Sequence, residues 1–437
     1  MKVSISGVRG IFGEDLNLKD IIHFCRNFSR LVKSKKCVVG RDTRPSGEIV
    51  TNVAVASLLE RGITVYNLGI SPTPVVFREA RKYGSGLIVT SSHNPLEWNG
   101  LKFILDGRGI NESELEYLLK DDQFHREKIS TETQIDSNYI DEAIKIIGDI
   151  KKAPKIAIDV GGGAAFQVAP QLLRKLGCKV SVINGVPGKS VRGPDPTNDK
   201  LLGLVNASKK TDLGFAFDLD GDRLVVVEGG RKKSPDVTLG LGIAGALKKG
   251  YKRFVLSIDT SVAIEKFIIN EGGKVNRSKV GEANVVDMML RTKSQAGGEG
   301  SSAGFILPEF NMCRDGILTS GLIASMLGTK QFHDIMAFME GYHQIRTKVN
   351  VDSKLHKKTL DIFLKHMKKQ SSQIITIDGI KSIMDEDSWV LVRQSNTEHI
   401  IRISAESNNL IKAKTIEKQI SKMVKLSYEE ARRDRNN

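Results

Sequence analysis

The sequence predicts an α/β protein in which parallel strands alternate with helices, and three segments support this prediction. In the first, a short apolar run at residues 38–39 ends at Gly40, and Ser46 is expected to cap a helix with regularly spaced apolar residues. Gly62 ends this helix, and residues 63–66 form the next expected strand. A strand, a helix and a second strand in this order are typical of a parallel βαβ unit.

Two later segments repeat the pattern. A strand is expected at residues 155–160, directly before a run of glycines that begins at Gly161. A helix over residues 236–247 precedes a strand at 254–258 and a second helix over 262–269. Because a chain of 437 residues exceeds the size that a single core usually supports, we expect several domains.

The composition is that of a globular protein, with 40% hydrophobic and 27% charged residues. No apolar run approaches the roughly 20 residues that a membrane span requires, and the N-terminus does not resemble a signal peptide. The four cysteines are far apart and form no CxxC pair, which argues against zinc and against a disulfide framework. We therefore expect a cytoplasmic protein with no membrane partner.

The formal net charge is +15. The basic residues are dispersed and few aromatic residues lie among them, so nucleic acid is not the expected partner. A field that attracts small anionic substrates is equally consistent with this charge.

The most informative stretch is residues 86–102, GLIVTSSHNPLEWNGLK. An apolar strand changes abruptly to small hydroxyl residues, and Pro95 disfavours a helix, so we expect a loop that exposes a hydroxyl. Ligands bind at the carboxyl ends of strands in α/β sheets. A serine there is a candidate nucleophile, and Lys102, expected just past a turn at Asn99–Gly100, is a candidate source of positive charge or of a proton. From these residues alone, a polar turn with capping hydroxyls is favoured over a catalytic loop.

The second informative stretch is residues 213–228, LGFAFDLDGDRLVVVE. Three carboxylates in one loop repel each other unless a hard cation neutralises them, and oxygen ligands suit Mg²⁺. The candidate ligands are Asp218, Asp220 and Asp222. The loop is not an EF-hand, because Arg223 and Gly229 stand where that motif requires glycine and glutamate. The alternative is an acidic surface turn.

The remaining loops are less specific. The glycines after residue 160 are not a dinucleotide fingerprint, because Phe166 stands where the last glycine is required, and GVPGKS lacks the first glycine of a P-loop. Residues 106–149 are expected to be mainly helical. We expect residues 297–309, GGEGSSAGFILPE, to form a flexible loop that suits hydrogen bonding to a sugar. RQSNTE, which begins at Arg393, offers a guanidinium, hydroxyls and turn amides that suit an anion.

TSSHNP, DLDGDR, GGEGSS and RQSNTE occur in the order and at roughly the spacing of the α-D-phosphohexomutase superfamily, which the chain resembles from Gly7 to its last anion loop. The resemblance implies three similar α/β domains and a smaller C-terminal α+β domain, similar to the TATA-binding-protein fold, around a central cleft. The expected domains are residues 1–150, 151–234, 235–345 and 346–437.

The resemblance also implies the roles of individual residues. Ser92, directly before His93, matches the serine that is phosphorylated in the active enzyme, and we prefer it to Ser91. Its phosphate and the three aspartates would hold Mg²⁺, and Arg9 and Lys102 match the pair that handles protons. The residues implied to bind the substrate are Arg223, Lys279, Glu299 and Ser301. Those implied to hold the phosphate that is not reacting are Arg393, Ser395, Asn396, Thr397 and Arg402.

The implied reaction transfers phosphate from the serine to a hexose phosphate, and a hexose 1,6-bisphosphate is the intermediate and activator. Glu282 and the GGEG loop look more like phosphoglucosamine mutases, particularly archaeal ones, whereas phosphomannomutases and phosphoglucomutases often carry histidine in place of Glu282. Ser302 and Ala303 replace the last two residues of the usual sugar loop, so its histidine is missing. Gln394, Asn396 and His399 also depart from the family pattern, and a phosphosugar-binding protein without turnover stays a rival. We expect a monomer or homodimer.

Overall fold

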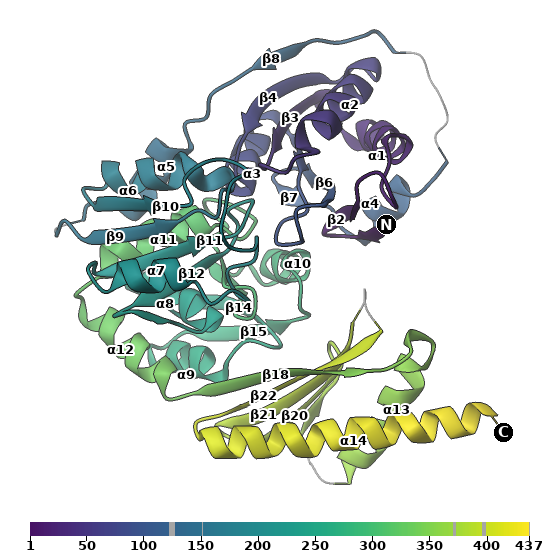
Figure 1. The fold of residues 1–437 in the computed structure, drawn as a ribbon, viewed down its shortest axis with the longest axis vertical. Helices are drawn as coiled ribbons and strands as arrows, with labels where there is room; N and C mark the ends of the chain where they lie inside the picture. Colours follow the sequence, from purple (N-terminus) through teal and green to yellow (C-terminus); the bar gives the residue numbers. More distant parts are fainter. Residues whose placement is uncertain (122–126, 151, 370–372, 396–398, 437) are drawn as a thin grey trace.

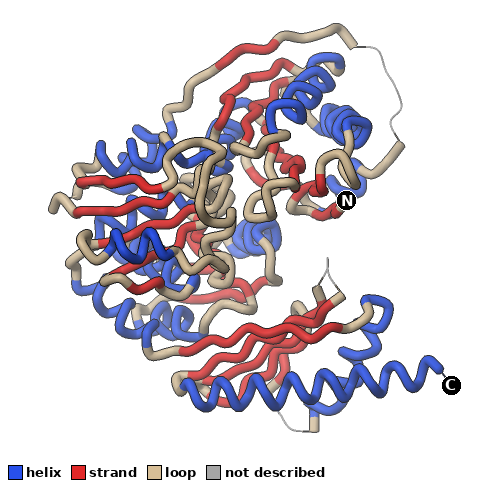
Figure 2. The backbone as a smooth tube through the Cα atoms, viewed as in Figure 1, coloured by secondary structure: helices blue, strands red, loops and turns tan. Residues whose placement is uncertain are grey.

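The computed structural model describes residues 1–121, 127–150, 152–369, 373–395 and 399–436. Four sheets follow one another along the chain, and we number the bodies built on them domains I to IV (Figure 1). In domains I to III, helices pack on both faces of each sheet. Domain IV forms a separate lobe whose sheet and long C-terminal helix lie across from domain I (Figure 2). The expected fold class, α/β domains followed by a C-terminal α+β domain, is confirmed.

Domain I has an eight-stranded mixed sheet in the order β1-β2-β6-β5-β3-β4-β8, with β7 paired to β6. The strands are β1 (Lys2–Ser4), β2 (Gly7–Ile11), β3 (Lys36–Arg41), β4 (Thr64–Ile70), β5 (Ser85–Val89), β6 (Trp98–Leu105), β7 (Arg108–Gly109) and β8 (Glu132–Gln134). The helices are α1 (Leu18–Leu31), α2 (Gly47–Glu60), α3 (Thr73–Tyr83) and α4 (Glu112–Leu118). The predicted βαβ unit is β3, α2 and β4, and β3 runs parallel to both β4 and β5. β5 is buried along its whole length, as expected for a strand covered on both faces.

The expected turn at Asn99–Gly100 is wrong, because both residues lie inside β6. Gly100 pairs with Arg9 of β2, and a Cβ at Gly100 would stand 2.1 Å from the Val8 carbonyl oxygen. The glycine therefore permits close packing of two strands. Ser46 occupies the N-cap position of α2, but its side chain makes no capping bond and accepts one from Asn99 Nδ2 at 2.9 Å.

The expectation of a mainly helical segment over residues 106–149 is only partly right. Besides α4 and α5 (Tyr139–Ile147), the described part of this segment contains β7 and β8. β8 adds to the edge of the first sheet by pairing in parallel with β4. It is short and fully exposed, so its residues lack the apolar pattern that would have indicated a strand.

Domains II and III share one large apolar core. The sheet of domain II has the order β10-β9-β11-β12-β13, and that of domain III has the order β15-β14-β16-β17. The strands of domain II are β9 (Lys155–Asp159), β10 (Lys179–Ile183), β11 (Leu213–Phe217), β12 (Leu224–Glu228) and β13 (Arg231–Lys232), and its helices are α5, η1 (Ala164–Phe166), α6 (Val168–Lys175) and α7 (Leu202–Ser208). Domain III contains β14 (Arg253–Ser257), β15 (Lys274–Ser278), β16 (Ala296–Glu299), β17 (Gly304–Ile306), α8 (Pro235–Lys248), α9 (Val262–Asn270), α10 (Glu282–Thr292), α11 (Gly316–Met326) and α12 (Lys330–Glu340).

Residues 297–309 do not form the flexible loop that we expected, because β16 and β17 pair as an antiparallel hairpin here. The glycines serve close packing instead. A Cβ at Gly297 would stand 1.9 Å from the Val255 carbonyl oxygen, and one at Gly300 would stand 1.9 Å from Asp236 Oδ1. The hairpin is therefore fixed by its neighbours.

Domain IV has an antiparallel sheet in the order β18-β22-β21-β20-β19. Its elements are β18 (His343–Asn350), η2 (Ser353–Leu355), α13 (His356–Lys368), β19 (Ile374–Ile375), β20 (Ile380–Asp385), β21 (Ser388–Gln394), β22 (Ile400–Ser407) and α14 (Leu410–Asn436). α13 and α14 cover one face, and Trp389 and Leu391 on the other face pack against Ile258 of domain III. Within the described ranges, no helix has the length and apolar character needed to cross a membrane.

The turns that follow β5, β11 and β16 meet at the centre of the molecule. Each of these strands runs parallel to a neighbour, and each is buried throughout. Carboxyl ends of such strands are where α/β sheets bind ligands.

Candidate active site

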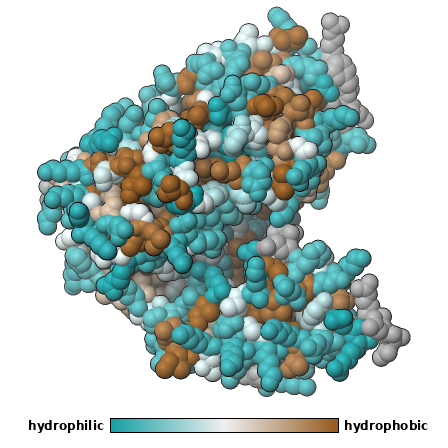
Figure 3. All heavy atoms as spheres, viewed as in Figure 1, coloured by the Kyte–Doolittle hydropathy of each residue, from teal (hydrophilic) through white to brown (hydrophobic). Residues whose placement is uncertain are grey.

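A cleft of about 930 Å³ lies between the four domains, and the surface is deeply hollowed between domains I and IV (Figure 3). Every domain contributes to its lining. The charged lining residues include Arg9, Lys102, Asp195, Arg223, Glu282, Glu299, Arg314, Arg346, Lys348, Arg393 and Arg402. Cations outnumber carboxylates in this set, which suits an anionic ligand.

The two adjacent serines after β5 point to different partners. Ser92 Oγ donates a hydrogen bond to Asp218 Oδ2 at 3.1 Å, whereas Ser91 Oγ donates to Asn94 Oδ1 at 3.2 Å. Ser92, whose φ of +51° lies in the left-handed region, therefore faces the acidic loop of domain II, whereas Ser91 does not.

The acidic loop between β11 and β12 is fully buried. Its three aspartates are 0% exposed, and one carboxylate oxygen of each lies within 4.8 Å of those of the others. Gly221 makes the tight bend with a φ of +74°, which favours glycine. The alternative interpretation, an acidic surface turn, is thus excluded.

The donor set fits a hard divalent cation. Asp220 Oδ1 and Asp222 Oδ1 are buried and accept no hydrogen bond from any residue that the structure describes. Unsatisfied carboxylate oxygens are costly in a protein interior, and a bound cation would remove this cost. Burial raises the pKa of Asp218 well above its ordinary value, and the carboxylates of Asp222 and Asp220 raise it further. These oxygens are the ligands that Mg²⁺ prefers.

Lys102 and Arg9 come from neighbouring strands of domain I. Arg9 pairs with Gly100, and Lys102 lies two residues further along β6, so both side chains are on one face of the sheet. Lys102 Nζ donates to Asp220 Oδ2 at 2.7 Å and to Asp222 Oδ2 at 3.1 Å. Burial lowers the pKa of Lys102, but the two carboxylates more than compensate and hold it above its ordinary value. Burial lowers the pKa of Arg9.

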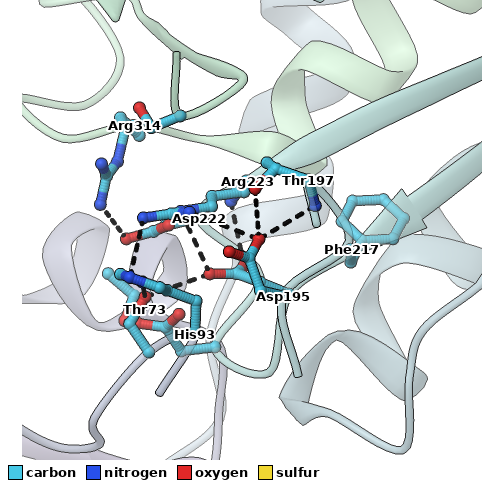
Figure 4. Close-up of polar contacts among 12 residues, drawn as sticks. Thr73, His93, Asp195, Thr197, Phe217, Asp222, Arg223 and Arg314 are labelled. Atoms are coloured by element: carbon cyan, nitrogen blue, oxygen red, sulfur yellow. Dashed lines mark hydrogen bonds and ion pairs between the residues drawn. The ribbon is translucent and has the colours of Figure 1, made fainter. Parts of the chain in front are cut away.

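Arg223 lies at the end of the acidic loop, between two domains (Figure 4). Its backbone N–H donates to Asp218 Oδ1 at 3.0 Å, and its Nη1 donates to Asp195 Oδ1 at 3.4 Å. Thr197 holds the Asp195 carboxylate through its backbone N–H at 2.9 Å and its hydroxyl at 2.7 Å. Asp195 was not predicted as a site residue, because it stands in a loop with ordinary turn residues.

His93 Nδ1 lies 3.4 Å from Ser92 Oγ. Burial lowers the pKa of His93 well below its ordinary value, and the nearby guanidinium groups of Arg223 and Arg9 lower it further. The imidazole next to Ser92 is therefore neutral at physiological pH.

Arg314 was not predicted as a site residue, yet it contacts three carboxylates. Its Nη2 lies 2.8 Å from Asp222 Oδ2, its Nη1 lies 3.1 Å from Glu299 Oε2, and its Nε lies 3.3 Å from Glu282 Oε2. A Cβ at Gly304 would stand 2.1 Å from Arg314 Cδ, so this glycine makes room for the side chain. Arg314 connects the acidic loop with the β16–β17 hairpin.

Of the residues predicted to bind the substrate, Glu299 and Ser301 line the cleft and Lys279 does not. Glu299 Oε1 accepts a hydrogen bond from the Gly281 N–H at 2.6 Å. Lys279 is exposed and is absent from the residues that line the cleft, whereas Glu282, at the start of α10, lines it.

Domain IV brings two of the predicted phosphate-binding cations to the cleft, Arg393 and Arg402. Arg393 also pairs with Asp378 at 3.2 Å. Ser395 is buried and donates its backbone N–H to the Ile400 carbonyl at 3.0 Å. Asn396 and Thr397 lie outside the described residues. Arg346, which was not predicted, lines the cleft and pairs with Asp236 at 3.0 Å.

Comparison with known protein families matches the four domains of phosphoglucomutase/phosphomannomutase. The α/β/α domains I, II and III match residues 1–130, 137–231 and 234–342, and the C-terminal domain matches residues 347–423. A phosphoglucomutase/phosphomannomutase from Thermococcus kodakarensis is 34% identical over 436 residues, which cover 93% of this chain and 95% of the relative. A probable phosphoglucosamine mutase from Methanothermobacter thermautotrophicus is 32% identical over 432 residues, which cover 94% and 95%.

Solved structures share the fold. A phosphoglucomutase/phosphomannomutase family protein from Burkholderia thailandensis superposes with a TM-score of 0.84 at 23% identity, covering 98% of both chains. An N-acetylphosphoglucosamine mutase from Aspergillus fumigatus, solved with GlcNAc-6P and magnesium, has a TM-score of 0.63 at 12% identity and covers 98% of this chain and 96% of its own. With all four domains matched in order, the chain belongs to the phosphoglucomutase/phosphomannomutase family of the α-D-phosphohexomutase superfamily, whose members are isomerases that interconvert sugar phosphates.

Proposed function

We propose that this phosphohexomutase is a phosphoglucosamine mutase, which interconverts glucosamine 6-phosphate and glucosamine 1-phosphate through a phosphate carried on Ser92. The observation that carries the proposal is the 3.1 Å hydrogen bond from Ser92 Oγ to Asp218 inside a cleft that all four domains line. This contact gives a nucleophilic oxygen beside a candidate cation site, with positive side chains around it.

In the proposed first step, the bond from phosphorus to Ser92 Oγ breaks and a bond from phosphorus to a free sugar hydroxyl forms. The hydroxyl proton leaves the sugar, and the serine oxygen takes up a proton when it is released. Arg9 and Lys102 are the proposed groups for these proton transfers, since both side chains line the cleft on one face of domain I. Lys102 is held protonated by its two carboxylate partners, which suits the donor role.

Asp218, Asp220, Asp222 and the Ser92 phosphate would hold Mg²⁺, which when bound supplies positive charge against the equatorial oxygens of the phosphate. Arg223 is placed to add positive charge at the same position, because its backbone is fixed to Asp218. Phosphoryl transfer depends mainly on such positioning and electrostatic stabilisation.

The product of the first step is a hexose 1,6-bisphosphate. To return its other phosphate to Ser92, this intermediate must present its opposite end, so the non-reacting phosphate needs a site of its own. Arg393 and Arg402 are the proposed site, because they approach the cleft from domain IV, opposite domain I. Guanidinium groups suit phosphate because they can bond two oxygens at once.

The amino sugar is proposed on the basis of Glu282. Its Oε2 is held by Arg314, through Nε at 3.3 Å and through the backbone N–H at 2.8 Å, while the side chain lines the cleft. A carboxylate fixed in this way can accept from the 2-ammonium group of glucosamine. Glu299 and Ser301 are proposed to accept and donate at the sugar hydroxyls. Several archaeal relatives named probable phosphoglucosamine mutase support this choice.

The alternative is phosphomannomutase/phosphoglucomutase activity, which the name of the 34% identical relative favours. Initial rates on glucosamine 6-phosphate, mannose 1-phosphate and glucose 1-phosphate, each with Mg²⁺ and catalytic glucose 1,6-bisphosphate, separate the two. We expect the highest kcat/KM for the glucosamine phosphate. A clear preference for a neutral sugar contradicts the proposal, and binding without turnover of any of the three supports the rival phosphosugar-binding protein.

A further inference from the structure

Arg44, in the loop between β3 and α2, is buried against the backbone of the Ser92 loop, with 1% of its surface exposed. Its Nη2 donates to the Ser92 carbonyl at 2.6 Å and to the Asn94 carbonyl at 2.8 Å. Its Nη1 donates to the Trp98 carbonyl at 2.7 Å and also to the Pro95 carbonyl. One guanidinium group therefore holds the whole connection from β5 to β6.

Asp42 holds Arg44 in this position. Asp42 Oδ2 accepts from Arg44 Nε at 3.0 Å, and Asp42 Oδ1 accepts from the Arg44 backbone N–H at 3.0 Å. Asp42 Oδ2 also accepts from the Thr90 hydroxyl at 2.5 Å, and Thr90 Oγ1 in turn accepts from the Ser92 N–H at 2.8 Å. Both polar backbone groups of Ser92 are thus fixed to one buried carboxylate, its carbonyl through Arg44 and its N–H through Thr90.

The backbone of Ser92 requires such support. Its φ is +51°, in the left-handed region that residues other than glycine rarely adopt. This conformation directs Oγ toward Asp218 at 3.1 Å. A strained residue keeps its conformation only when its surroundings hold it there.

We propose that Arg44 is a positioning residue for phosphoryl transfer, which holds Ser92 in the left-handed conformation with Oγ facing the acidic loop. Arg44 is not placed to touch phosphate or sugar, because it is not among the residues that line the cleft. Its five N–H groups are all used, by four carbonyls and Asp42. The proposal rests on the proposed function in one respect, that Ser92 is the residue that carries the phosphate.

The geometry also predicts that lysine cannot replace this residue. A guanidinium group presents five donors in a planar fork, whereas an ammonium group presents three donors at one point. The four carbonyls belong to both ends of the loop, so an ammonium group cannot reach all of them. Arg44→Lys keeps the charge next to Asp42 and loses the bridge.

The test compares Arg44→Lys with Arg61→Lys. Arg61 is also buried, at 4% exposure, and lies at the C-terminal cap of α2 in the same domain, but it does not line the cleft. Three properties are measured: kcat and KM for the best hexose phosphate, the rate at which glucose 1,6-bisphosphate phosphorylates Ser92, and thermal unfolding. Intact mass and peptide mapping follow the phosphorylation.

We expect Arg44→Lys to lower kcat and the phosphorylation rate by about 100-fold, the size of effect that a misplaced reacting group produces. KM should stay within about 3-fold of wild type. Arg61→Lys should retain both rates.

A second variant keeps the proposal testable if Arg44→Lys fails to fold. Thr90→Val removes the acceptor for the Ser92 N–H with little change in volume, and it should give the same loss of kcat without a rise in KM. Near-normal phosphorylation of Ser92 in both variants overturns the proposal for Arg44, and so does an equal loss in Arg61→Lys. If wild-type protein takes its phosphate on a residue other than Ser92, the proposed function fails instead, so the two failures are distinguishable.

Discussion

Arg314 Nη2 lies 2.8 Å from Asp222 Oδ2, and this contact joins domain III to the candidate metal loop of domain II. The same guanidinium group bonds Glu299, which lines the cleft, at 3.1 Å. Arg314 therefore connects the proposed sugar-binding side of the cleft with the proposed metal-binding loop. Binding at either side is expected to depend on this residue.

Arg314→Gln should raise KM for the hexose phosphate by about 10-fold or more, because Glu299 and Glu282 lose a charged hydrogen-bond partner. It should also lower the free energy of unfolding by about 3 kcal/mol, since buried carboxylates are left unpaired. Steady-state kinetics and urea unfolding measure the two effects. Arg291→Gln is the control, because the ion pair of Arg291 with Asp287 is exposed and should cost less than about 1 kcal/mol. An unchanged KM in Arg314→Gln would show that binding of the hexose phosphate does not depend on Arg314.

Glu282→Gln should lower kcat/KM for glucosamine 6-phosphate by about 10-fold, because the charged acceptor for the ammonium group is removed. The values for mannose 1-phosphate and glucose 1-phosphate should change much less. Glu265→Gln, in α9 and paired with Arg277, controls for the loss of a domain III carboxylate that does not line the cleft. An equal loss on all three sugars would show that Glu282 does not select the amino sugar.

Arg393→Gln should raise KM by about 10-fold for the 1-phosphate and the 6-phosphate alike, because either end of the substrate must use the distal site. Kinetics in both directions of the reaction measure this. Lys412→Gln removes an exposed cation of α14 that pairs with Asp385, so it controls for the charge of domain IV. A rise in KM for only one of the two hexose phosphates would show that Arg393 does not hold the non-reacting phosphate in both directions of the reaction.

The stability of the protein should depend on pH through Asp315, which caps α11 and accepts from the Tyr139 hydroxyl at 2.5 Å. Burial raises the pKa of Asp315 from 3.8 to about 6. The folded state therefore favours the protonated acid, and the stability that protonation contributes is complete below the unfolded pKa and is lost as the pH rises through about 6.

Urea unfolding of wild type and Asp315→Asn at a series of pH values tests this. The free energy of unfolding of wild type relative to the variant should fall by about 2 kcal/mol between about pH 4.5 and about pH 7. Asp141→Asn removes a carboxylate whose side chain is 63% exposed and controls for charge alone. A difference between wild type and Asp315→Asn that is constant over this range would show that Asp315 is ionised throughout.

Ser92, the three aspartates and Lys102 could be named from the sequence because each belongs to a short continuous motif next to an apolar strand. Such strands are covered on both faces, so their ends lie where α/β sheets bind ligands. The parallel unit β3–α2–β4 was predicted correctly for the same local reason.

Arg314 and Asp195 were missed because their partners are distant in sequence. Arg314 contacts residues 222, 282 and 299, and no local pattern around it indicates this. Gly304 makes room for its side chain, but a single glycine does not indicate this role in the sequence. Arg44 was missed for the same reason, because the four carbonyls to which it donates lie about 50 residues away in the sequence.

The wrong predictions of a turn at Asn99–Gly100 and of a flexible loop over residues 297–309 have one cause. Asn99–Gly100 and the glycines after residue 296 have the composition of turns and flexible loops. In the structure, these glycines lie where another strand or side chain comes too close for a Cβ, at Val8 and Val255 among others. Both predictions failed because close tertiary contacts, which a local sequence pattern does not report, require glycine at these positions.

The central claim is that Ser92 carries the phosphate, and intact mass with peptide mapping tests it most directly. Wild type, Ser92→Ala and Ser91→Ala are each incubated with glucose 1,6-bisphosphate and Mg²⁺. Wild type and Ser91→Ala should gain one phosphate on Ser92, and Ser91→Ala should keep most of its turnover, because at most a supporting hydrogen bond of about 0.5–1.5 kcal/mol is lost. Ser92→Ala should gain none and should lose turnover while still binding hexose phosphate. Phosphate on Ser91, or near-normal turnover in Ser92→Ala, would contradict the account.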